Sequence, residues 1–88
     1  MPNVWFQNES LEEFMYWANN DRKTFDKIYK LFKDIERNGA ANGIGKPERL
    51  KHQPGWSRRI DEKNRLIYEV DENNIIAVKS CKGHYGDK

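Results

Sequence analysis

The sequence predicts an α+β fold in which two N-terminal helices pack on a twisted antiparallel sheet of four to five strands. Apolar residues recur at helical spacing in the first half of the chain, and period-two alternation dominates the second half. Clusters of turn-forming residues separate the strand candidates. A length of 88 residues suits one small hydrophobic core, so we expect a single domain spanning residues 1–88.

The first two elements are a short strand and a helix. Asn3–Gln7 is aromatic and β-branched, which is typical of a strand. Ser10 then offers an N-cap, and Glu13 stands three residues later, the spacing of a capping box. An apolar repeat follows at Leu11, Phe14, Met15 and Ala18. A helix is therefore predicted from Ser10 to about Asn20.

A second helix follows directly. Asn19-Asn20-Asp21 breaks the first helix and caps the next, which should end where Asn38-Gly39 supplies a left-handed cap. Its apolar face is made of Phe25, Ile28, Tyr29, Phe32 and Ile35. Such a stripe is typical of a core rather than of a cofactor site, so the two helices should form a hairpin covering the sheet.

The second half begins with small residues from Gly39 to Gly45 and an irregular basic segment, with a short strand expected around Arg49–His52. Three further strand candidates are Trp56–Ile60, Asn64–Val70 and Ile75–Lys82. The short turns between these candidates predict an antiparallel meander.

The charge distribution favours a polyanionic partner. Between Lys46 and Arg65 there are seven Lys and Arg residues but three Asp and Glu residues. No apolar run approaches the roughly 18 residues that span a bilayer, and no signal pattern opens the chain, so we expect a cytoplasmic protein with no membrane partner. Cys81, the single cysteine, is expected to be a buried residue of the last strand rather than a nucleophile.

Two arginines are candidates for phosphate binding. Strand alternation separates Leu66 and Tyr68 from Arg65, so helices that cover the former leave Arg65 on the open face. Arg59, on the adjacent strand, should converge with it. Paired guanidiniums suit a phosphate whose charge grows in a transition state. The alternative is a pair of surface arginines in salt bridges with Glu62 or Glu69.

The remaining candidates complete a metal-free RNA-cleaving set. His84 is the expected proton donor, since histidine titrates near pH 6.5, and Tyr85 is an aromatic that can stack on a base. Glu48 lies between Lys46, Arg49 and Lys51 and is either the acceptor of the 2′-hydroxyl proton or a group that orients the ribose and arginines. No metal-ligand spacing is present, and we expect no cofactor.

Several ordered motifs resemble the YoeB branch of the RelE/ParE toxin superfamily. They are Gly45-Lys46-Pro47-Glu48, Leu50-Lys51-His52, Trp56-Ser57-Arg58-Arg59-Ile60, Arg65-Leu66-Ile67-Tyr68 and His84-Tyr85. The similarity extends from Trp5 to Tyr85. It implies a microbial-ribonuclease-like fold and a toxin that enters the A site of the 70S ribosome and cuts the mRNA there.

The resemblance also implies residue roles. Glu48 matches the proton acceptor, His84 the proton donor, Arg65 the phosphate-stabilising arginine and Tyr85 the C-terminal aromatic. The RNA-positioning residues are expected at Lys46, Lys51 and Arg59. A homodimer and a YefM-type antitoxin, which binds operator DNA, are the implied partners.

The chain also departs from the family pattern. Gly83 stands where a bulkier residue is common, and Gly86-Asp87-Lys88 follows the His-Tyr pair, changes expected to loosen the tail. Two other functions remain open from the sequence. One is a non-catalytic RNA- or ribosome-binding inhibitor of translation, and the other is the gyrase-poisoning branch of the superfamily, which lacks this acid, arginine and histidine set.

Overall fold

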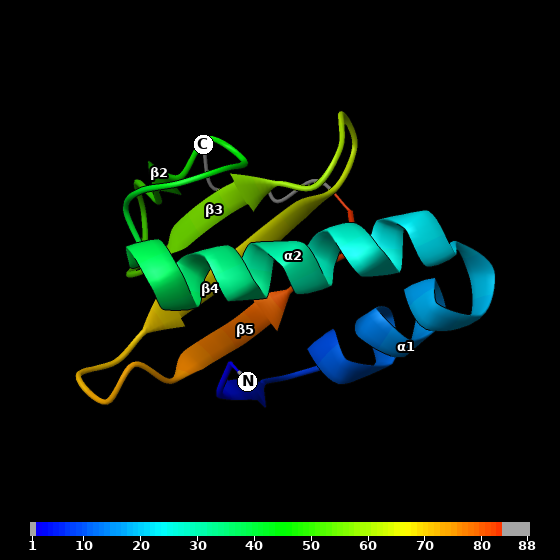
Figure 1. Ribbon diagram of the computed structural model, residues 1–88. Helices are drawn as coiled ribbons and strands as arrows, with labels where there is room; N and C mark the ends of the chain where they lie inside the picture. Colours follow the sequence, from blue (N-terminus) through cyan, green and yellow to red (C-terminus); the bar gives the residue numbers. More distant parts are fainter. Residues whose placement is uncertain (1, 84–88) are drawn as a thin grey trace.

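The computed structural model describes residues 2–83 and has the predicted α+β architecture. Its elements are β1 (Val4–Phe6), α1 (Ser10–Asn20), α2 (Arg22–Asn38), β2 (Glu48–Arg49), β3 (Trp56–Arg59), β4 (Arg65–Val70) and β5 (Ile76–Ser80). Figure 1 shows both helices on one face of the sheet. No helix within residues 2–83 is long and apolar enough to cross a bilayer.

The strand order in the sheet is β1-β5-β4-β3-β2. The predicted meander is confirmed, because β3, β4 and β5 pair antiparallel, and β2 joins β3 antiparallel. The pairing of β1 with β5 is parallel, with Val4 opposite Ile76, so the sheet is mixed. A parallel pair needs a long crossover, which the helices and the meander provide here.

The short strand β2 begins one residue earlier and ends sooner than the sequence suggests. It comprises Glu48 and Arg49, and the Leu50 N–H then donates to the Gly55 carbonyl at 3.0 Å. This bond closes a loop at residues 50–55, so Lys51 and His52 lie in the loop rather than in a strand.

The capping box predicted for α1 is wrong. Glu9 occupies the N-cap position and makes no side-chain cap bond. The Ser10 hydroxyl instead donates to the Val78 carbonyl at 3.0 Å, and the Glu13 carboxylate accepts the Cys81 N–H at 2.7 Å. Both side chains thus bind the β5 region, because tertiary partners replace the local ones and fix α1 against the sheet.

Helix α2 begins and ends as predicted. The Asp21 carboxylate accepts the Thr24 N–H at 3.3 Å, which satisfies one unpaired donor of the first turn. Gly39 follows the last helical residue with φ of 87°, a backbone conformation that glycine adopts readily.

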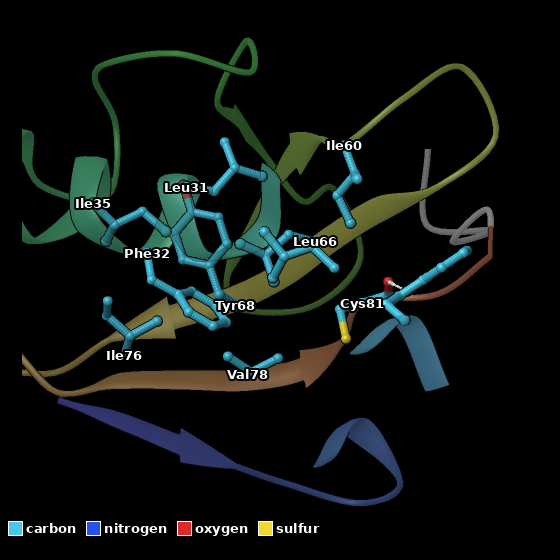
Figure 2. Packing of buried hydrophobic residues seen from close by; sticks show 11 residues of the cluster. Leu31, Phe32, Ile35, Ile60, Leu66, Tyr68, Ile76, Val78 and Cys81 are labelled. Atoms are coloured by element: carbon cyan, nitrogen blue, oxygen red, sulfur yellow. Dashed lines mark hydrogen bonds between the residues drawn. The ribbon is translucent and has the colours of Figure 1, made fainter. Parts of the chain in front are cut away.

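The hydrophobic core lies between the helices and the sheet (Figure 2). Its fully or nearly fully buried members include Ile28, Leu31, Phe32, Ile35, Leu66, Tyr68, Ile76, Val78 and Cys81. The predicted stripe of α2 is shifted slightly, since Tyr29 remains 38% exposed whereas Leu31 is fully buried. The stripe is core, as expected from its helical spacing.

A buried arginine joins the two halves of the molecule. The Arg58 side chain is completely buried on β3, and its Nε donates to the Tyr68 hydroxyl at 2.8 Å. Its Nη1 donates to Asp34 at 2.5 Å and to the Ile44 carbonyl at 2.9 Å. Its Nη2 donates to the carbonyls of Gly39 at 2.9 Å and Asn42 at 2.6 Å. The five N–H donors of one guanidinium are therefore all used.

These bonds hold the Gly39–Gly45 loop against β3. The Tyr68 hydroxyl donates to the Ala40 carbonyl at 2.6 Å, and the Arg59 N–H donates to the Gly45 carbonyl at 2.6 Å. A Cβ on Gly45 would lie 3.1 Å from the Arg59 carbonyl oxygen, so the close approach needs glycine. The start of β2, two residues after Lys46, is thereby fixed.

Replacing Arg58 should destabilise the fold strongly. Arg58→Met leaves Asp34 and several carbonyls without their donor, and we expect the free energy of unfolding to fall by about 3–5 kcal/mol. Urea denaturation measures this change. Arg37→Met, at an exposed position in the last turn of α2, is the matched control and should lose no more than about 1 kcal/mol. Equal losses in the two variants would contradict the anchoring role.

The Asp34 carboxylate should make stability depend on acid pH. Burial raises the pKa of Asp34, but hydrogen bonds from Arg58 and the Ile44 amide, together with the Arg58 charge, lower the pKa below its ordinary value. Because the folded-state pKa is depressed, the stabilisation is complete above the unfolded pKa of about 3.9 and disappears as pH falls through the folded pKa.

Thermal unfolding of the wild type and Asp34→Asn between pH 7 and pH 2 tests this expectation. The melting-temperature difference between them should be largest near neutrality and should narrow below about pH 4. A difference that stays constant over this range would show that ionised Asp34 contributes nothing to stability.

Candidate active site

The candidate site occupies the sheet face opposite the helices. Cross-strand register aligns Glu48 with Ser57, Ser57 with Ile67, and Arg59 with Arg65. Since Leu66 and Tyr68 point into the helix-covered core, period-two alternation directs their neighbours to the other face. The structure thus places Glu48, Arg59 and Arg65 on one face.

Part of this face is buried beneath other residues. Ser57 is 5% exposed and Ile67 is fully buried. Lys79 of β5 donates to the Gln53 side chain at 3.4 Å and to the Pro54 carbonyl at 3.2 Å. Because β2 and β5 are separated by two strands, these contacts mean that the loop at residues 50–55 reaches across the sheet toward β5.

The predicted arginine and glutamate lie within ion-pair distance. Arg65 Nη1 is 4.0 Å from Glu48 Oε1, with the Arg65 side chain 17% exposed and the Glu48 side chain 68% exposed. Arg59 is exposed directly opposite Arg65 on the neighbouring strand. The alternative ion pair of Arg65 with Glu69 is not formed, since Glu69 binds Lys79 at 2.9 Å.

The two predicted lysines lie at the ends of β2. Lys46 is exposed before the strand and has a positive φ of 52°, and Lys51 is exposed after it. Their positions flank Glu48, and their roles as RNA contacts stay predictions. His84 and Tyr85 lie outside the described residues.

The last described residue lies at the edge of the site. The backbone N–H of Arg65 donates to the carbonyl of Gly83 at 3.2 Å. Gly83, the last residue that the structure describes, is therefore bonded to the strand that carries Arg65.

The arrangement can bind and polarise an anion. Arg65 is mostly buried but has an accessible fraction, and Arg59 places a second cation across the strand pair. Neighbouring, partly accessible guanidiniums bind phosphate oxygens with fixed geometry. The Glu48 carboxylate lies near Arg65 and is largely exposed to solvent.

A cysteine nucleophile does not fit the structure. Burial, with a smaller contribution from the Glu13 charge, raises the pKa of Cys81 to about 12. Its side chain is completely buried in the core, as predicted, just beyond the end of β5. Within residues 2–83, no group of three or more His, Cys, Asp or Glu side chains is arranged to hold a metal ion.

Sequence reasoning missed the structural role of Arg58. The available signal was its alternation with Trp56 and Ile60, which places it on the helix-covered side of β3. A charged residue in that phase indicates a buried hydrogen-bond network, because an unpaired buried guanidinium is strongly destabilising.

The comparisons with known proteins agree with this fold. The family described as "YoeB-like toxin of bacterial type II toxin-antitoxin system" matches residues 6–85. Toxin YoeB of Escherichia coli K12 is 39% identical over 87 residues, covering 97% of this chain and 100% of the relative. Two Staphylococcus aureus structures are also similar.

One is the heterotetrameric YoeB-YefM toxin-antitoxin complex, with a TM-score of 0.90, 46% identity, and coverage of 97% of this chain and 99% of that one. The other is a YoeB dimer, with a TM-score of 0.88, 46% identity, and coverage of 96% and 98%. Fold and sequence together define the class as the toxin component of a type II toxin–antitoxin system. The chain belongs to the YoeB-like toxin family.

The candidate site should contribute little to stability. The Glu48–Arg65 pair is long and Glu48 is largely exposed, so Glu48→Gln should change the free energy of unfolding by less than about 1 kcal/mol. Denaturant unfolding of the two proteins side by side provides the measurement. A loss of several kcal/mol would mean that Glu48 is a structural residue and would weaken its assignment to chemistry.

Proposed function

We propose that this chain is a ribosome-dependent mRNA endoribonuclease that cuts mRNA in the ribosomal A site and thereby inhibits translation. The observation that carries the proposal is the convergence of Glu48, Arg59 and Arg65 on the sheet face opposite the helices. A carboxylate beside two guanidiniums suits attack of a ribose 2′-hydroxyl on the adjacent phosphate.

In the proposed reaction, the 2′-oxygen forms a bond to phosphorus as the bond to the 5′-oxygen breaks. The 2′-hydroxyl proton passes to Glu48, and Arg65 with Arg59 stabilises the added charge on the phosphate. A cyclic phosphate and a 5′-hydroxyl end result. Glu48 alternatively orients the ribose and the arginines, and the test below includes a variant for this distinction.

The other predicted roles follow from the sequence. His84 donates the proton that the leaving 5′-oxygen needs, and Tyr85 stacks on a base of the unpaired RNA. Lys46 and Lys51, exposed on either side of Glu48, bind the RNA backbone. The chemistry uses side chains alone, with no cofactor.

The partners are inferred from the S. aureus relatives. Because that YoeB occurs in a complex with YefM and also as a dimer, we propose a YefM-type antitoxin and a homodimer for this chain. A basic open face suits an acidic segment that folds on binding. Action on ribosomes places the protein in the cytoplasm.

The test is a reconstituted translation reaction on a defined mRNA, with cleavage ends mapped by primer extension and ribosome-free RNA as the control. We expect cuts within codons that require ribosomes. Loss of general acid catalysis in His84→Ala should slow cleavage by about 10²–10⁴-fold. Arg65→Met should also slow cleavage strongly, since it removes charge stabilisation.

Glu48→Gln separates the two roles of the carboxylate. If Glu48 accepts the proton, its titration produces the acid limb of the wild-type pH–rate profile, and Glu48→Gln removes that limb. If Glu48 only orients the ribose and the arginines, Glu48→Gln lowers the rate but the acid limb remains. Translational arrest without any cut, equal in the wild type and His84→Ala, would replace this proposal with a non-catalytic RNA- or ribosome-binding inhibitor.

A further inference from the structure

We propose that Lys79 is a positioning residue for RNA binding, because it holds the loop at residues 50–55 in the place from which Lys51 reaches the RNA backbone. This inference rests on the proposed function, in which Lys51 binds RNA. Lys79 lies on β5, which two strands separate from Glu48 on β2. Its effect on RNA binding therefore has to pass through the loop.

The Lys79 ammonium uses all of its donors within the protein. Its Nζ lies 2.9 Å from Glu69 Oε2, 3.2 Å from the Pro54 carbonyl oxygen and 3.4 Å from Gln53 Oε1. One acceptor thus comes from β4, and the other two come from the loop. Because an ammonium carries three N–H donors, none is left for a phosphate. The Lys79 side chain is also only 19% exposed, so it holds the loop rather than contacting RNA itself.

A β-bulge lies at the position of Lys79. Tyr68 pairs with Val78, but Ile67 pairs with Ser80, so Lys79 is the extra residue of β5 at this register shift. Bulges redirect side chains and are frequent beside functional sites. Here the bulge coincides with the side chain that binds the loop.

Both ends of the loop are fixed by other contacts. A Cβ on Gly55 would lie 3.0 Å from the Tyr68 carbonyl oxygen and 3.2 Å from Glu69 Cγ, so the end of the loop is packed against β4. At the start of the loop, Leu50 is buried, and its N–H donates to the Gly55 carbonyl at 3.0 Å. The middle of the loop depends on Lys79.

Lys51 lies in the part of the loop that Lys79 orders. It is exposed and follows the buried Leu50, and the residues that Lys79 binds, Gln53 and Pro54, come shortly after it. A loop fixed only at its ends retains conformational freedom, and ordering it on binding lowers the affinity. Lys79 removes that freedom before RNA binds, so it should increase affinity by preorganisation.

The groups proposed for the chemical step are held independently of Lys79. Glu48 pairs with Ser57 through the register of β2 and β3, and Arg59 pairs with Arg65 through that of β3 and β4. Neither pairing includes a residue of the loop. Loss of the Lys79 contacts should therefore weaken RNA binding and leave the chemical step unchanged.

The experiment measures single-turnover cleavage by the full chain on programmed ribosomes at increasing toxin concentration. Lys79→Met should raise the toxin concentration for half-maximal rate about 3–10-fold, with the maximal rate constant within about 2-fold of wild type. Lys30→Met removes the same charge from an exposed position on α2, on the other side of the sheet (Figure 1). It is the matched control and should behave as wild type.

The salt dependence of binding reports the phosphate contact. Each phosphate contact contributes a slope of about 0.9 to the plot of log affinity against log salt concentration. Lys79→Met and Lys51→Met should each lower the slope for the half-maximal toxin concentration by about 1. A raised half-maximal concentration with an unchanged slope in Lys79→Met would overturn the inference, since the phosphate contact would then be intact.

A double-mutant cycle assigns the effect to Lys51. If Lys79 acts through Lys51, adding Lys79→Met to Lys51→Met should raise the half-maximal concentration less than about 2-fold further. Equal increases in both backgrounds would overturn the inference, because Lys79 would then act on another group. So would wild-type behaviour of Lys79→Met, or a loss confined to the maximal rate constant.

Two further variants separate loop position from charge and from folding. Gly55→Ala changes no charge but crowds the Tyr68 carbonyl at a φ of 122°, so it should weaken binding as Lys79→Met does. Lys79→Arg keeps the charge and has enough donors for the same acceptors, so it should bind within about 3-fold of wild type. Wild-type binding by Gly55→Ala, or a folded Lys79→Arg that binds as weakly as Lys79→Met, would contradict the positioning role.

Lys79→Met is expected to fold. Its partner Glu69 is 43% exposed and stays hydrated when the ammonium is removed. Thermal unfolding of each variant checks this expectation.

The outcomes separate the two proposals. Ribosome-dependent cutting by the wild type, with the same concentration dependence in Lys79→Met, overturns the positioning inference alone. Failure of the wild type to cut at all overturns the proposed function, and the inference with it.

Discussion

The hydrogen bonds of the buried Arg58 guanidinium are the interaction on which the rest of the molecule depends. An ionised side chain removed from water destabilises a fold by several kcal/mol unless its donors are satisfied, and here the acceptors come from α2, from the Gly39–Gly45 loop and from β4. The chain therefore brings these segments together in one arrangement. The loop, once held, delivers Glu48 to its place opposite Ser57.

The neighbouring arginine has the opposite surroundings. Arg59 points away from the core and lies directly across from Arg65. Like charges in opposed cross-strand positions are destabilising, and one partly exposed carboxylate at 4.0 Å offsets that repulsion only in part. An anion between the two guanidiniums relieves the repulsion. The register of β3 and β4 thus brings two cations together, and Arg58 supplies the rigidity that keeps them close.

The sequence predicted the helices, the meander and the face that carries Arg59 and Arg65, because those depend on local periodicity. It did not predict the parallel pairing of β1 with β5, since alternation contains no information on strand direction. The prediction of a capping box was wrong for a related reason. The Ser10 hydroxyl donates to the Val78 carbonyl, 68 positions away, and no local pattern reveals that acceptor. The hydrogen bonds of Arg58 and the bond between Asn64 and Gly83 depend likewise on partners distant in the sequence.

Gly83 shows how a flexible residue is made compatible with a precise site. Its φ of 90° is open to glycine and strained for other residues, so glycine permits the path that the chain takes here. Glycine alone would loosen the segment, which was the expectation from sequence. Hydrogen bonds at its N–H and its carbonyl remove that freedom, and both come from residues at the start of β4. The start of β4, which carries Arg65, thereby also binds the last described residue of the chain.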